Sequence, residues 1–104
     1  SSGELIGFAV TLRFTGNSRV LNDQQDGHLQ RRLKSEADTI ICWGYTTAQN
    51  PNSWALAHAS SRAQAACNMA LESMPGVSSI VRLRYGIPKD LAMRASVQFW
   101  RVVE

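Results

Sequence analysis

The chain has 104 residues, of which 44% are hydrophobic and 18% charged, and its formal net charge is +3. This length and composition fit a single globular domain with one core and exclude a disordered chain. No apolar run approaches the roughly 20 residues of a membrane-spanning helix, and the basic residues are scattered, which disfavours nucleic acid as a partner.

The first predicted element is a strand with a period of two. Its apolar positions, alternating with small or polar residues, are Ile6, Phe8, Val10, Leu12 and Phe14. Such alternation is typical of a half-buried strand, so we expect these side chains to share the buried face. Residues 1–4 precede the pattern and are interpreted as the edge of a linker.

A helix is predicted next, from a cap at Asn22 or Asp23 to about Lys34. Its expected buried stripe consists of Leu21, Gln25, Leu29 and Leu33. The short apolar run at 39–43 is rich in β-branched residues and ends at a glycine. This run predicts a central strand that is covered on both faces.

A second helix is predicted from Trp54 to about Ser73, with Ser53 as its N-cap. Its many alanines favour a helix, and their small face permits close approach to a sheet. That face consists of Ala59, Ala63, Ala66 and Ala70. Two further strands are predicted, at 79–85 and 95–103, with a turn at 86–90 between them.

The order of elements is therefore strand, helix, strand, helix, strand, strand. Strands separated by helices imply right-handed crossovers and parallel directions. We predict an α/β (α+β) two-layer sandwich, with two helices on one face of a four-stranded mixed sheet. The whole chain, 1–104, is interpreted as one domain.

The sequence offers little support for an enzyme. His28 and His58 have no cysteine or carboxylate at a spacing that suggests a catalytic pair, and the acidic residues form no constellation. No glycine-rich phosphate loop and no local pair of metal ligands is present, so neither a cofactor nor a metal is predicted. Cys42 and Cys67 lack a C-x-x-C spacing and could be two buried thiols or one disulfide.

A binding site is the better interpretation. Polar loops follow the first and second predicted strands, and ligands of α/β layers lie beyond such strand ends. Arg62, on the next helix, can direct its planar fork to a carboxylate at the same edge. The alternative is that Arg62 bridges the loops structurally. The candidate ligand-binding residues are Arg62, Thr47, Thr46, Tyr45 and Asn17.

Four short motifs then suggest a family. They are Gly44-Tyr45-Thr46, Ser61-Arg62-Ala63, Phe14-x-x-Asn17-Ser18 and Val97-Gln98-Phe99. In order and spacing the chain resembles the OmpA-like domain, the peptidoglycan-associating module of outer-membrane proteins, Pal-type lipoproteins and flagellar stator subunits. The resemblance implies a non-catalytic domain of the bacterial cell envelope, periplasmic or extracytoplasmic. It further implies binding of the diaminopimelate carboxylate of peptidoglycan stems through Arg62, with any membrane attachment supplied by other parts of the protein.

The chain departs from the family pattern at Thr47, at His58-Ala59 before Arg62, and at Arg94-Ala95-Ser96, where two arginines of the family are missing. Thr47 stands where the family has the aspartate that holds the ligand's ammonium group. An alternative is therefore a degenerate OmpA-like domain that serves as a protein–protein assembly module in an envelope, secretion or motility complex, with other envelope proteins as partners. The resemblance also implies an oxidising compartment, and with it a Cys42–Cys67 disulfide.

Overall fold

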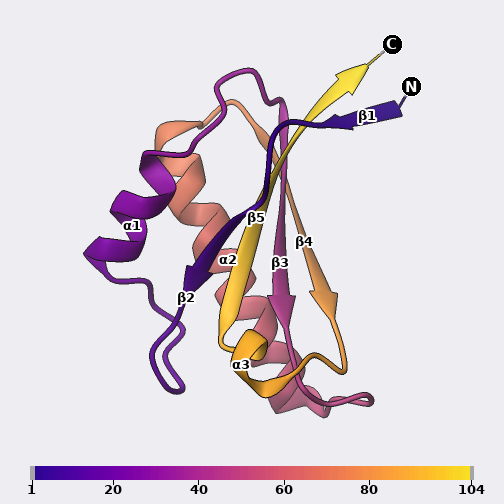
Figure 1. Cartoon of the computed structure of the whole chain (residues 1–104). Helices are drawn as coiled ribbons and strands as arrows, with labels where there is room; N and C mark the ends of the chain where they lie inside the picture. The colour runs from indigo at the N-terminus through magenta and orange to yellow at the C-terminus, as the bar shows by residue number, and fades with distance from the viewer. Residues whose placement is uncertain (1, 104) are drawn as a thin grey trace.

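The computed structural model describes residues 2–103 and contains one mixed five-stranded sheet with its two longer helices on one side (Figure 1). The strands are β1 (Ser2–Leu5), β2 (Val10–Arg13), β3 (Thr39–Tyr45), β4 (Ser78–Arg84) and β5 (Arg94–Val103), and the helices are α1 (Asp23–Gln30), α2 (Ser53–Ser73) and α3 (Lys89–Ala92). The predicted two-layer α/β architecture is confirmed. Within residues 2–103 no helix is long and apolar enough to cross a membrane.

β5 organises the sheet, because three other strands pair with it. The strand order is β1-β5-β3-β4, and β2 also pairs with β5. β5 is antiparallel to β1, β2 and β3, whereas β3 and β4 are parallel neighbours joined through α2. Val97 of β5 lies between Val10 and Cys42 in the register, and all three side chains are buried beneath the helices.

The N-terminal segment differs from its prediction as one strand. β1 pairs Leu5 with Trp100, and β2 pairs Val10 with Val97, so residues 6–9 lie opposite only Gln98 and Phe99. Two residues are therefore looped out, Gly7 takes a φ of 66°, and the side chain of Phe8 is 91% exposed instead of buried.

The sheet consequently has five strands rather than four. Within residues 1–4, interpreted from the sequence as the edge of a linker, Ser2–Glu4 pair with residues 101–103 of β5. Residue 1 lies outside the described part of the chain.

α1 begins as predicted and ends early. Asn22 caps it, with its side-chain oxygen accepting a hydrogen bond from the Gln25 N–H at 2.9 Å. The helix ends at Gln30 instead of Lys34, because the Arg32 N–H bonds to the carbonyl of Leu29 and so tightens the last turn. Within the predicted stripe Leu21 and Leu29 are buried, whereas Gln25 and Leu33 are only partly so.

β3 is central but is covered on one face only, which corrects the expectation of two buried faces. Ile40, Cys42 and Gly44 are buried, and the residues between them are only partly so. The reason is that α2 packs on one side of the strands, behind them in Figure 1, and α1 packs beside β2 and α2. The opposite side of the sheet is called the uncovered face below.

α2 approaches β3 closely through its small side chains. Ala63, Ala66 and Ala70 are fully buried, as predicted for the alanine face. A Cβ atom added to Gly44 would lie 2.2 Å from the carbonyl oxygen of Ala59, so only glycine fits there. A disulfide between Cys42 and Cys67, whose Cα atoms are 5.8 Å apart, joins β3 to α2.

Candidate functional site

A cavity of about 370 Å³ lies at the end of β3, between the loop after β2, the first turns of α2 and α3. The structure brings all five predicted binding residues to its wall: Asn17, Tyr45, Thr46, Thr47 and Arg62. This cavity is called the strand-end cavity below.

Arg62 is placed there by the start of α2. Asn52, not the predicted Ser53, caps this helix, and its Oδ1 accepts a hydrogen bond from the Ala55 N–H at 2.8 Å. The close approach of Ala59 to Gly44 then fixes the helix against the end of β3. One turn further along, Arg62 faces the loop that follows β2.

The side chain of Arg62 is buried and extensively bonded. Only 3% of the residue is exposed, and its guanidinium donates from Nε to the carbonyl of Ser18, from Nη1 to Ala92 and from Nη2 to Gly16, at 2.9, 3.2 and 2.7 Å. It also lies over the ring of Phe14, 5.1 Å from the centroid.

These contacts give Arg62 the structural bridging role that the sequence left open as an alternative. Three of the five guanidinium N–H groups are used, and two donate to no described residue. Burial and the nearby charge of Arg19 lower the pKa of Arg62, but a guanidinium stays protonated at neutral pH. The cavity wall thus holds a fixed positive charge.

The other charged groups at the cavity are also basic. Lys89 lines it, Arg19 lies beside His58, and no lining residue is an aspartate or glutamate. The pKa of His58 is lowered by burial and by the charges of Arg62 and Arg19. His58 is therefore neutral at pH 7, and its Nδ1 accepts a hydrogen bond from the Nε of Arg19 at 2.9 Å.

Trp54 forms an aromatic rim to the same cavity. Its ring stacks on that of His58 with a centroid distance of 4.9 Å, and 59% of the residue is exposed. Sequence reasoning missed Trp54 and His58 as cavity residues. Their spacing could have indicated this position, because Trp54, His58 and Arg62 are four residues apart along the helix and therefore share one face of it.

The remaining predicted residues differ in what they offer a ligand. Thr46 is buried, and its backbone N–H and carbonyl bond to Arg84 and Ile87. The hydroxyl of Tyr45 bonds to Ser96 Oγ at 2.9 Å on the uncovered face, away from the cavity. Thr47 and Asn17 are exposed, so their side chains are accessible.

The fold has a solved counterpart. The OmpA-like domain of FopA1 from Francisella tularensis subsp. tularensis SCHU S4 superposes with a TM-score of 0.61, at 14% sequence identity over 92% of this chain and 73% of that one. No protein-family model matches the chain, and no curated protein matches it by sequence. The chain therefore has the OmpA-like fold, in a form that has diverged widely in sequence.

Proposed function

We propose that this domain is a non-catalytic module of the bacterial cell envelope that binds the peptide stems of peptidoglycan in the strand-end cavity. The observation that carries the proposal is the position of Arg62, which lines a cavity with basic and no acidic side chains and has two N–H groups that donate to no described residue. The OmpA-like fold and the buried Cys42–Cys67 disulfide, which suits an oxidising extracytoplasmic compartment, support it.

The ligand group that this cavity suits is a carboxylate. A guanidinium matches a carboxylate in shape and charge, and Lys89 adds a second cation at the rim. The ammonium group of diaminopimelate finds only the neutral hydroxyl of Thr47, and a neutral hydrogen bond is roughly half as strong as a charge-assisted one. We therefore expect the carboxylate to dominate the affinity.

An NMR titration of the labelled domain with a diaminopimelate-containing stem peptide tests the proposal. We expect shifts at Thr46, Thr47 and the Arg62 side chain, and weaker binding by Lys89→Gln. Lys34→Gln removes the same charge away from the cavity and should bind like the unmodified domain. No shifts at the strand-end cavity at millimolar peptide would refute wall-peptide binding there.

A gain of function gives an independent test. Thr47 is exposed, so Thr47→Asp should fold normally and restore a charged acceptor for the ammonium group. We expect Thr47→Asp to bind the stem peptide about tenfold more tightly, and Thr47→Asn to bind it like the unmodified domain. Equal affinities of all three proteins would show that the ammonium group is not bound beside residue 47.

A second function, assembly with other envelope proteins, is favoured by one observation. Arg62 donates to the backbone carbonyls of Gly16, Ser18 and Ala92, and Thr47 stands where the family has an aspartate, so the cavity has fewer groups left for a zwitterionic ligand. Co-sedimentation with purified sacculi separates the two functions. Domain that stays in the supernatant at low salt, yet forms a complex with an envelope protein, would support assembly.

A further inference from the structure

The uncovered face of the sheet gathers arginines from three strands. Residues that pair across a sheet share a face, and the register pairs Arg13 with Arg94, Trp43 with Arg82 and Tyr45 with Arg84. No aspartate or glutamate occupies this face in the five described strands. Four of the 11 basic residues, which are scattered in sequence, thus share one face of the sheet, which the sequence did not indicate.

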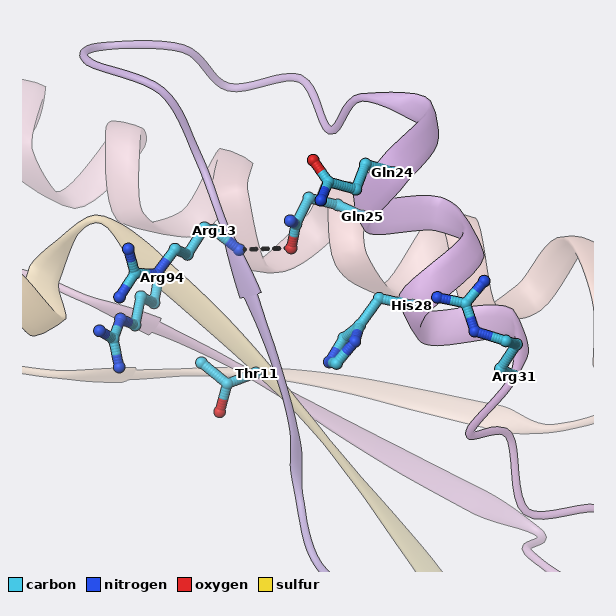
Figure 2. Close-up of a pocket in the computed structure, with 7 residues that line it drawn as sticks. All are labelled: Thr11, Arg13, Gln24, Gln25, His28, Arg31 and Arg94. Carbon is cyan, nitrogen blue, oxygen red and sulfur yellow. Dashed lines mark hydrogen bonds between the residues drawn. The ribbon is translucent and has the colours of Figure 1, made fainter.

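Three of these arginines, Arg13, Arg84 and Arg94, line a groove made of three adjoining cavities that share residues. The first, of about 320 Å³, lies between α1 and β2, where the side chains of Arg13 and Arg94 lie near each other and His28 points toward Thr11 (Figure 2). The second, of about 250 Å³, shares Thr11 and Arg94 with the first.

The third cavity, of about 150 Å³, shares Tyr45, Arg84 and Ser96 with the second and extends to Trp43. None of the residues lining the three cavities is acidic. Together they are called the arginine groove below. It runs from α1 across β2 and β5 to β3 and β4.

One donor in this groove has no acceptor. The Nε atom of Arg94 is buried and makes no hydrogen bond within the described residues. A buried donor without a partner is costly, and an oxygen acceptor that reached Nε through a shift of the Arg94 side chain would relieve that cost. Arg94 lines the first two cavities, so an acceptor bound there would lie within the groove.

The aromatic residues of the face argue against nucleic acid. One face of the Trp43 ring is covered by Arg84, whose guanidinium carbon lies 5.0 Å from the ring centroid. The indole N–H groups of Trp43 and Trp100 both donate to Gln98 Oε1, at 2.8 and 3.3 Å. Stacking of bases needs open ring faces, and the Trp43 ring is already occupied.

The apolar residues of the groove suit a polypeptide. Ile87 and Leu91 line the second cavity together with Arg84 and Arg94, so the same cavity offers apolar and basic contacts. We propose that the arginine groove binds an extended acidic segment of a partner protein, with its carboxylates on the arginines and an apolar side chain against Leu91. The disulfide of the domain suits an oxidising compartment outside the cytoplasm.

The groove and the strand-end cavity share one lining residue, Tyr45, and are otherwise lined by different residues. α3 lies between them, since Lys89 and Ala92 line the cavity and Leu91 lines the groove. The groove can therefore be altered without touching Arg62, Thr47 or Lys89. Loss of peptidoglycan binding and loss of acidic-segment binding can therefore be observed independently, each in its own set of variants.

Fluorescence anisotropy at low salt, with a labelled peptide of alternating glutamate and leucine, tests the proposal. The double variant Arg13→Gln with Arg84→Gln removes two exposed charges from the groove and should bind at least about tenfold more weakly. The control, Arg32→Gln with Arg101→Gln, removes two exposed charges outside the groove and should bind like the unmodified domain. Thermal unfolding of each variant checks that it is folded.

Three results would overturn the proposal. The first is no binding of the acidic peptide, or equal binding of an analogue with glutamine at each glutamate. The second is an equal loss in both double variants, which would show an effect of net charge alone. The third is oligothymidylate bound more tightly than the peptide and weakened only by the groove variant, which would identify nucleic acid as the occupant.

Discussion

Arg62 donates a 2.7 Å hydrogen bond from Nη2 to the carbonyl of Gly16, a residue 46 positions earlier in the chain. Its bonds to Ser18 and Ala92 join the loop after β2 and the end of α3 to the same helix. One side chain therefore builds the wall of the strand-end cavity and supplies the charge within it.

Arg62→Ala should destabilise the domain, because it leaves three backbone carbonyls without their donor. We expect the free energy of unfolding to fall by about 3 kcal/mol or more, measured by urea denaturation. Arg82→Ala, an exposed site, should change it by less than about 0.5 kcal/mol. Similar small effects of both substitutions would mean that the Arg62 bonds contribute little.

Gly44→Ala should also be destabilising, because the added methyl group would lie 2.2 Å from the carbonyl oxygen of Ala59. Separating α2 from β3 should cost about 1–3 kcal/mol in thermal or urea unfolding. At Gly76 a Cβ meets nothing within 4 Å, so Gly76→Ala is the matched control and should be nearly neutral. If Gly44→Ala were as stable as Gly76→Ala, the close approach of helix and strand would be wrong.

Removal of the disulfide should lower stability without changing the fold. Cys42 and Cys67 are 25 residues apart, and a crosslink closing a loop of that length contributes about 3 kcal/mol. We expect the Cys42→Ala, Cys67→Ala double variant to lose about this amount in chemical denaturation, with the circular dichroism spectrum retained. Two free thiols found by titration of the unreduced native domain would contradict the crosslink.

Acidification should destabilise the domain through His58. Its pKa in the folded state lies below the ordinary 6.5, so the unfolded chain binds a proton more readily. Stability is therefore unaffected by His58 well above pH 6.5 and falls as the pH drops through and below that value. Protonation would also break the hydrogen bond that His58 accepts from Arg19.

Thermal unfolding between pH 8 and pH 5 measures this effect. His58→Gln keeps an acceptor for Arg19 and should flatten the acid side of the profile. The pKa of His28 is lowered too, by burial and by the charges of Arg32 and Arg31. The variant His28→Gln therefore measures how much His28 contributes to the loss of stability at acidic pH. An unchanged profile in His58→Gln would assign the whole dependence to other groups.

The sequence was informative wherever a local rule and the tertiary packing agree. Val10 and Leu12 alternate with polar residues and are buried as expected, and the alanine face of α2 packs on the sheet as expected. The sequence also predicted that Arg62 and the residues after Gly44 lie at the same edge of the sheet, and both line the strand-end cavity.

The sequence was uninformative where pairing between distant strands decides the outcome. Phe8 continues the apolar alternation, but the bulge opposite Gln98 and Phe99 turns it to solvent. The continuous apolar run of β3 predicted two buried faces. Nothing in the local sequence shows that the helices cover only one side of the sheet. The arginine groove is likewise a product of register, since Arg13 and Arg94 meet only when β2 pairs with β5.

The pairing of β5 has a consequence for how the chain folds. The β3–α2–β4 unit has its own crossover and contains both cysteines, so we expect it to form early, with pulsed hydrogen exchange as the measure. β1 and β2 pair only with β5 among the described strands, across more than eighty positions of chain. β1 and β2 are therefore synthesised long before β5 and stay without a partner strand until it has emerged.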